Sequence, residues 1–402
     1  MALLLIFCIS EFEKYEENNM RIEHSKWRED FAYIVSQIEE FHPRAFHNIT
    51  KEDLQNELET LVVETYELTD YDVAFELNRI IAMLGDGHTY VSYKYIYSED
   101  WYPVLFVIID GKAYIRDAYK EYDDVLYKEV IEFNGHDASD VISKLSEYIS
   151  GENEYIVESY VESRLSNPMI LRYLDIVSEK GKLELTINDD DKISRRSVEK
   201  VPYSEVYTYF DEKRFIGNRS GVNNYSYEYF PDADTMMFYY NVCFEDDELP
   251  METFNDEFWD QVKDKKVDKI IVNLSGNAGG YPEVINPFFK KLYKSDFNKK
   301  EKLFVLIGNR NYSAGTMAAS RFKTTTEAIL IGEPTGGTPV MCFDTVECIT
   351  PNKGIELYVA TDTFVAHYDV SHNTIMPDVY IQKTIEDYRN NINPFLEYVQ
   401  TR

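Results

Sequence analysis

The fold is decided by residues 267–280, which read VDKIIVNLSGNAGG. The apolar run from Val267 to Leu274 predicts a buried strand, and the glycine-rich segment after it predicts a tight turn with exposed backbone N–H groups. Three similar strands are predicted in the same region, with apolar helices between them: Met236 to Val242, Leu303 to Ile307 and Ala328 to Ile331. Near-continuous apolar strands that alternate with helices are typical of a parallel sheet covered on both faces.

Upstream of this α/β region, residues 25–84 predict three amphipathic helices, because apolar residues recur there at helical spacing. Thr50 is expected to cap the second helix, Thr69 or Asp70 the third, and Gly85 to end the third.

Residues 101–200 have a different pattern. Strands are predicted at Val104 to Ile109 and at Glu129 to Phe133, and the hairpin signals Asp110-Gly111 and Asn134-Gly135 follow them. A helix and a further strand complete one small α/β module, which we expect to position the substrate and to do no chemistry itself.

The composition excludes several function classes. The chain has 402 residues, of which 44% are hydrophobic and 15% aromatic, so it can bury a sizeable core and is not disordered. Its net charge of −31 disfavours binding to nucleic acid and to anionic membranes. Such a charge could attract basic peptides, but the simpler interpretation is a solvated acidic surface.

The four cysteines are Cys8, Cys243, Cys342 and Cys348. They form no CxxC pair, and no histidine cluster completes a zinc pattern, so we expect no metal and no other cofactor. Free buried thiols are predicted, with a Cys342–Cys348 pair across a hairpin as the alternative.

Residues 2–10, ALLLIFCIS, are the strongly apolar end of the chain. The run is far too short to span a bilayer, so no membrane span is expected. It resembles the hydrophobic part of a signal peptide without a basic leader. Two interpretations remain open: an exported protein whose start lies inside a longer signal sequence, which we favour, and a frayed apolar N-terminus on a cytoplasmic protein.

Three segments place glycine and small polar residues just after a strand, where sites form in α/β sheets. The first, Asn273 to Gly280, suits an oxyanion hole or a phosphate nest, although a plain tight turn is the alternative. The second, Gly308 to Thr316, reads GNRNYSAGT and puts Ser313 near a helix N-terminus, where free N–H groups stabilise an anion. An ordinary N-cap serine is the alternative there. The third, Gly332 to Gly337, is expected to wall the cleft.

A nucleophilic serine needs a base. Of the seven histidines, His88 lies in the glycine-flanked loop Gly85-Asp86-Gly87-His88-Thr89, from which a side chain can project freely. His88 is therefore the candidate base.

Taken together, these segments resemble the tail-specific (C-terminal processing) peptidases and their tricorn-core relatives, in family order along nearly the whole chain. The matching segments are LGDGHT at 84–89, EFNG at 132–135 in place of the I-N-G of a PDZ domain, NLSGNAGG at 273–280, SAG at 313–315, GEPTGG at 332–337 and the closing Pro377-Asp378. The chain departs from the family pattern at Asn273 and Ser275, where Asp and Arg are usual.

The resemblance implies a Ser–His mechanism rather than the Ser–Lys dyad of other family members. Thr338 stands where the dyad lysine would be, whereas His88 matches the histidine of the tricorn-like branch. That branch has a serine where this chain has Gly87. It also has a carboxylate that orients the histidine. Asp369 is the carboxylate nearest before the closing Pro-Asp, and a turn at Thr361 to Thr363 is expected to return it to the cleft. Ser371 is the alternative residue that could hold the His88 ring.

The resemblance also implies an α+β multidomain fold. Its expected parts are a possible truncated signal segment and arm at 1–24, a helical bundle at 25–95, a degenerate PDZ-like domain at 96–200 and a crotonase/ClpP-like α/β catalytic core at 201–402.

The function it implies is that of a serine-type peptidase acting on a peptide or protein, in an oligomeric state that is left open. The implied roles are Ser313 as nucleophile, His88 as base, Asp369 as its orienting acid, Gly279, Gly280 and Ala314 at the oxyanion hole, and Asn277, Gly336 and Gly337 at the cleft wall. A non-catalytic protein that binds hydrophobic ligands or peptides is the main alternative, and a scaffold acting through the PDZ-like domain is another.

Overall fold

The computed structural model describes residues 23–402 with the exception of 67, 179, 191, 213–222 and 367–371. The predicted apolar N-terminal segment and Cys8 lie outside the described residues. The chain divides into two compact units. One comprises residues 1–97, 147–150 and 342–363, and the other comprises residues 98–146, 151–341 and 364–402.

The first unit packs three helices against a three-stranded sheet. The helices span residues 23–41, Lys51–Glu64 (α2) and Asp70–Ala82 (α3). The strands are Tyr90–Val91 (β1), Glu356–Val365 (β16) and Val340–Ile349 (β15), in the order β1-β16-β15, and a 3₁₀ turn covers Tyr93–Ile96. The predicted helix caps are confirmed, because Thr50 accepts the N–H of Asp53 and Thr69 forms a capping box with Asp72.

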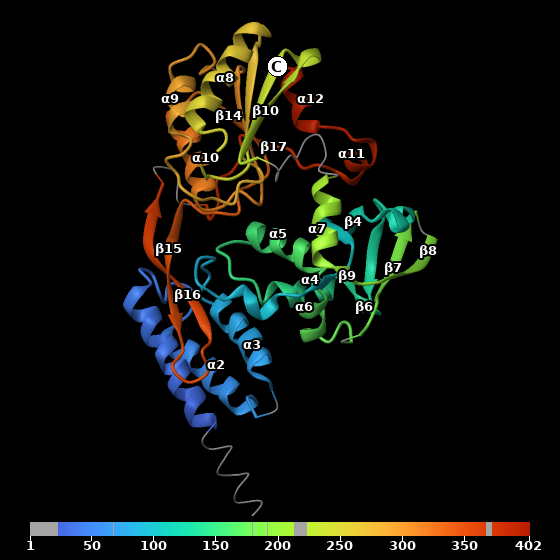
Figure 1. Cartoon of the computed structure of the whole chain (residues 1–402), viewed down its shortest axis with the longest axis vertical. Helices are drawn as coiled ribbons and strands as arrows, with labels where there is room; N and C mark the ends of the chain where they lie inside the picture. Colours follow the sequence, from blue (N-terminus) through green and yellow to red (C-terminus); the bar gives the residue numbers. More distant parts are fainter. Residues whose placement is uncertain (1–22, 67, 179, 191, 213–222, 367–371) are drawn as a thin grey trace, which may run out of the picture. The chain divides into compact units, whose positions relative to one another are not determined.

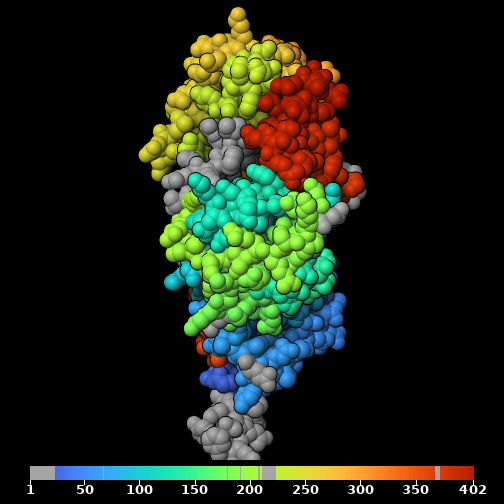
Figure 2. All heavy atoms as spheres, turned by 90° about the vertical axis from the view of Figure 1, so that its right-hand side faces the viewer, coloured from blue at the N-terminus to red at the C-terminus, as the bar shows by residue number. Residues whose placement is uncertain are grey.

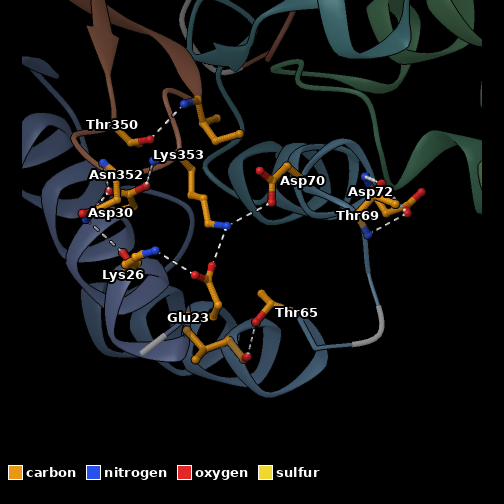
Figure 3. Close-up of polar contacts among 12 residues, drawn as sticks. Glu23, Lys26, Asp30, Thr65, Thr69, Asp70, Asp72, Thr350, Asn352 and Lys353 are labelled. Carbon is orange, nitrogen blue, oxygen red and sulfur yellow. Dashed lines mark hydrogen bonds and ion pairs between the residues drawn. The ribbon is translucent and has the colours of Figure 1, made fainter. Parts of the chain in front are cut away.

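The hairpin of β15 and β16 is anchored to the helices by polar contacts at its tip (Figure 3). The buried carboxylate of Asp30 accepts the backbone N–H groups of Asn352 at 2.9 Å and Lys353 at 2.8 Å, as well as the Asn352 amide at 2.9 Å. The Lys353 ammonium pairs with Glu23 at 2.8 Å and Asp70 at 3.2 Å. A segment of the chain that the sequence assigned to the C-terminal core therefore packs with the N-terminal helices.

The second unit contains a six-stranded sheet with helices on both faces (Figure 1). The strands, in spatial order, are Tyr225–Phe230 (β10), Thr235–Tyr240 (β11), Lys269–Asn273 (β12), Leu303–Ile307 (β13), Ile329–Gly332 (β14) and Val379–Tyr380 (β17). All neighbours pair in parallel except β10 and β11, which confirms the predicted parallel sheet.

Three helices cover one face of this sheet and share its core: Met251–Asp264 (α8), Asn286–Tyr293 (α9) and Ala314–Thr325 (α10). The C-terminal helix Pro394–Gln400 (α12) packs on the other face. Together with Ile385–Asn390 (α11) it forms the red surface in Figure 2.

The same unit holds a smaller antiparallel sheet in the order β3-β4-β5-β7-β8, with β6 paired to β5. Its strands are Val104–Ile109, Lys112–Ala118, Glu129–Phe133, Leu183–Asp189, Lys192–Val198 and, for β6, His136–Asp137. Both hairpin signals are confirmed: Asp110 and Gly111 have φ of 52° and 74°, and Asn134 and Gly135 have φ of 50° and 83°.

The remaining elements of this region are helices Ala138–Ser146 (α4), Glu154–Arg164 (α5), Pro168–Tyr173 (α6) and Tyr203–Glu212 (α7), the strand pair Asp100–Trp101 (β2) and Val201–Pro202 (β9), and 3₁₀ turns at Lys120–Val125 and Pro231–Ala233. None of the helices in the described residues is long and apolar enough to cross a bilayer.

One predicted local feature is wrong. A turn was expected at Thr361 to Thr363, but β16 continues through them to Val365. Threonine and valine suit an extended strand because their branched side chains fit a pleated surface.

Candidate active site

Ser313 is the last residue of the loop between β13 and α10. Its backbone angles, φ 49° and ψ −128°, are rarely adopted by residues that have a side chain. Such a conformation costs about 1–3 kcal/mol and persists only where the surrounding structure imposes it. The Ser313 side chain makes no capping hydrogen bond to α10, so the alternative of an ordinary N-cap serine does not describe this turn.

The fully buried side chain of Asn277 ties the glycine turn after β12 to its surroundings. Its Oδ1 accepts the Gly279 N–H at 2.9 Å and the Cys243 thiol at 3.3 Å, and its Nδ2 donates to the Tyr240 carbonyl at 2.8 Å. The backbone carbonyl of Asn277 accepts the N–H of Tyr312, the residue before the candidate nucleophile, at 2.9 Å. Asn277 thus holds the two predicted site segments together.

Gly279 lies directly against Ser313. A Cβ at Gly279 would come within 3.1 Å of both Ser313 Oγ and the Ala314 nitrogen, and its φ of 117° disfavours any other residue. The Gly279 N–H is already donated to Asn277. The amides of Gly280 and Ala314 meet no acceptor within the described part of the chain. The first N–H groups of a helix have no partner within it, so Ala314 offers an open donor.

The third predicted segment, Gly332 to Gly337, packs against the loop that carries Ser313. The Gly337 N–H donates to the Asn311 carbonyl at 3.0 Å. A Cβ at Gly336 would lie 2.3 Å from the Asn309 carbonyl oxygen, and a Cβ at Gly337 would lie 2.1 Å from the Thr316 hydroxyl. Glycine is needed at both positions because the backbone of Asn309 approaches Gly336 and the side chain of Thr316 approaches Gly337.

In the first unit, His88 lies in the loop between α3 and β1, and its side chain is 15% exposed. Burial lowers the pKa of His88, and this effect exceeds the opposite effect of the nearby charges of Asp86 and Asp344. Asp86 is buried beneath the loop and bonds His42 at 3.0 Å. The histidine is therefore neutral at pH 7, as a general base must be.

Residues 250–381 match the family model described as peptidase family S41. This segment of the chain is similar to the S41 peptidases. The chain is a serine peptidase, with peptides or proteins as substrates. No curated protein sequence matches the chain significantly.

Three solved structures have the same fold as this chain. Mature CPAF complexed with lactacystin is 13% identical, with a TM-score of 0.67 over 94% of this chain and 98% of that chain. Mature CPAF alone is 13% identical, with a TM-score of 0.65 over 94% and 97%. A putative peptidase from Parabacteroides merdae is 12% identical, with a TM-score of 0.50 over 93% and 96%.

The position expected for a dyad lysine is occupied by the buried Thr338, whose hydroxyl donates to the Val340 carbonyl at 2.6 Å. Asp369 and Ser371, the two residues predicted to orient His88, lie outside the described residues.

Sequence reasoning missed Glu152, which lies beside the loop that carries Ser313. Its carboxylate accepts the hydroxyl of Tyr312 at 2.7 and 2.9 Å. The two residues are 160 positions apart, and Glu152 belongs to no motif. The nearby Glu162 likewise pairs with Arg310 of the same loop at 2.9 Å. The segment around α5 therefore supports the loop that carries Ser313.

A cluster in the first unit has the composition of a metal site. His42, Asp86 and Cys342 bring ligand atoms within 4.8 Å of one another. However, both ring nitrogens of His42 take part in hydrogen bonds, one with Asp86 and the other with the backbone N–H of Arg44. The cluster is thus satisfied by hydrogen bonding. Cys243, Cys342 and Cys348 are buried and form no disulfide, so the predicted free thiols are confirmed for these three.

A groove of about 890 Å³ begins next to the glycine turn after β12. Tyr281, which follows Gly280, and Phe244, which follows Cys243, stand 61% and 45% exposed at its edge, with their rings 5.4 Å apart. Lysines of α9, among them Lys290, line another side. The groove offers aromatic surface to an apolar side chain close to the glycine turn after β12.

Proposed function

We propose that the peptidase cleaves peptide bonds with Ser313 as nucleophile and His88 as general base. The observation that carries this proposal is the strained backbone of Ser313, which directs a serine away from helix capping at the start of α10 and against Gly279. The assignment of His88 rests on the motif that it shares with tricorn-like relatives and on its neutral state at pH 7.

In this mechanism, Ser313 Oγ attacks the substrate carbonyl carbon while His88 takes its proton, and His88 then returns that proton to the leaving amine. The carbonyl oxygen becomes an anion in the tetrahedral intermediate. The Gly280 and Ala314 amides are the proposed donors, because the Gly279 N–H is already held by Asn277. A donor of this kind is worth about 3–4 kcal/mol in the transition state.

The test is labelling by a fluorophosphonate probe, which reacts with activated serines. The wild-type chain should be labelled at Ser313, and Ser313→Ala should lose both labelling and peptide hydrolysis while keeping the wild-type circular dichroism spectrum. Ser295→Ala is the matched control, since Ser295 lies at the end of α9 and bonds the Leu292 carbonyl instead. Hydrolysis that survives in Ser313→Ala would refute the assignment of the nucleophile.

A further inference from the structure

The groove next to the glycine turn after β12 is lined by residues of two helices. These helices, α8 and α9, pack side by side on one face of the sheet that contains β12 (Figure 1). Asn255 of α8 and Lys290 of α9 line the groove, together with Val284, which is only 6% exposed. Lys291 of α9 pairs with Asp256 of α8 at 3.0 Å, which links the two helices. The walls of the groove are therefore set by helix packing.

The two aromatic side chains at the edge of the groove are fixed to the glycine turn by backbone hydrogen bonds. The Cys243 N–H donates to the Gly279 carbonyl at 2.8 Å, and the Tyr281 N–H donates to the Cys243 carbonyl at 2.6 Å. A Cβ at Gly280 would lie 2.5 Å from the Cys243 carbonyl oxygen, so the two segments touch backbone to backbone. This pairing holds Phe244 and Tyr281 edge to face, with their ring planes at 89°.

The aromatic pair also lies close to the candidate nucleophile. Gly279 packs against Ser313. Consecutive Cα atoms are about 3.8 Å apart, so the Cα atom of Tyr281 lies at most about 7.6 Å from that of Gly279. An extended peptide covers this distance in about two or three residues. A substrate whose scissile carbonyl lies at Ser313 can therefore place a side chain from a neighbouring position in the groove.

The charged residues of the groove do not select its occupant. Lysines and glutamates line it in equal number: Lys290, Lys291, Lys294, Glu245, Glu252 and Glu283. Equal numbers of opposite charges give no net preference for a charged ligand. The aromatic rings do give a preference, because Tyr281 and Phe244 are 61% and 45% exposed. Covering this ring surface with an apolar side chain removes it from water, which is favourable.

We propose that Phe244 and Tyr281 form a specificity subsite of the peptidase, which takes a large apolar side chain of the substrate from within about three residues of the scissile bond. The occupant is the substrate itself, because the groove begins at the glycine turn that packs against Ser313. The inference rests on the proposed role of Ser313 as nucleophile and adds a cleavage preference to it.

The test is a set of uncharged fluorogenic peptides in which each position near the scissile bond is changed in turn from Ala to Leu or Phe. At one of these positions the wild-type chain should prefer the large side chain by about tenfold or more in kcat/KM, as expected of an apolar subsite. In Tyr281→Ala and in Phe244→Ala this ratio should fall to about twofold, because half of the aromatic surface is lost. Tyr281→Leu keeps an apolar side chain and should retain most of the preference.

Tyr293→Ala is the matched control. Tyr293 also belongs to α9 and is 50% exposed, but it stacks on Phe289 and does not line the groove. Its removal should leave the ratio at the wild-type value.

Two results would overturn the inference. The first is a wild-type chain with no preference for large apolar side chains, or a preference that survives in both Tyr281→Ala and Phe244→Ala. The second is an unchanged ratio together with a changed oligomeric state in these variants, which would make the aromatic pair a contact between copies of the chain. Labelling by the fluorophosphonate probe separates these results from failure of the proposed function: if Ser313 is labelled in each variant, only the subsite is wrong.

Discussion

The backbone conformation of Ser313 differs from that of an ordinary helix cap. A capping serine has extended backbone angles and bonds an N–H of the first turn, whereas Ser313 has a φ of 49° and makes no such bond. The contacts that impose this conformation come from Asn277 and Gly279. The adjacent Tyr312 is held from a third direction by Glu152.

The pH dependence of kcat/KM should report the protonation of His88. Burial lowers the pKa of His88, and only the neutral ring can accept a proton. The rate should therefore rise as pH increases through a midpoint below 6.5, the ordinary value for histidine, and then level off. The measurement is kcat/KM for an uncharged peptide between about pH 4.5 and pH 9.

A control is needed because another group near the loop that carries Ser313 has a pKa close to that expected for His88. Burial and the charge of Glu162 raise the pKa of Glu333 to about 7. The midpoint assigned to His88 should persist in Glu333→Gln. A rise that occurs only near the pKa of lysine would contradict a histidine base.

At the scale of elements, two loops and one hairpin depend on contacts from distant parts of the chain. The loop that carries Ser313 takes support from the segment around α5, through Glu152 and Glu162. The tip of the β15–β16 hairpin is held by Asp30 of the first helix, more than 300 residues away in sequence. In both cases a buried or half-buried carboxylate accepts hydrogen bonds from polar groups of a separate segment. These hydrogen bonds keep the segments in place.

Asp30→Ala should destabilise the first unit by about 2–3 kcal/mol, because two backbone N–H groups lose a charged acceptor in a buried position. The measurement is the melting temperature, which should fall by several degrees. Asp260→Ala is the matched control: Asp260 pairs with Lys263 on the surface, where both side chains are more than 70% exposed, and its loss should cost less than about 0.5 kcal/mol. Equal melting temperatures in the two variants would show that Asp30 does not anchor the hairpin.

For the whole molecule, the dominant physical property is its net charge of −31. A field of this size acts beyond individual contacts and raises the rate at which cationic molecules arrive, but added salt screens it over about 10 Å at 0.1 M. The charge therefore bears on the kinetics of substrate capture and not on the chemical step.

A basic peptide should lose several-fold in kcat/KM between about 20 mM and 500 mM NaCl, because screening removes its attraction to the enzyme. An uncharged peptide of the same length, assayed in parallel, should change little. If both peptides respond alike, the acidic residues form an ordinary solvated surface that does not steer substrates.

The sequence by itself determined the local architecture of this protein. Runs of apolar residues located the parallel strands, and Asp110-Gly111 and Asn134-Gly135 located two hairpins, because periodicity and left-handed turn residues act over a few positions. The glycine turn and Ser313 were also recognisable, since each directly follows such a strand.

Only the tertiary structure decided how these pieces support one another. The bond from Gly279 to Asn277, the contact of Tyr312 with Glu152, and the pair of His42 and Asp86 link residues by geometry that no local pattern encodes. The turn predicted at 361–363 was wrong for the same reason: pairing in the sheet formed with β1 and β15 extends that segment as a strand. Local residue preferences select elements, whereas burial and long-range hydrogen bonding select which polar groups meet.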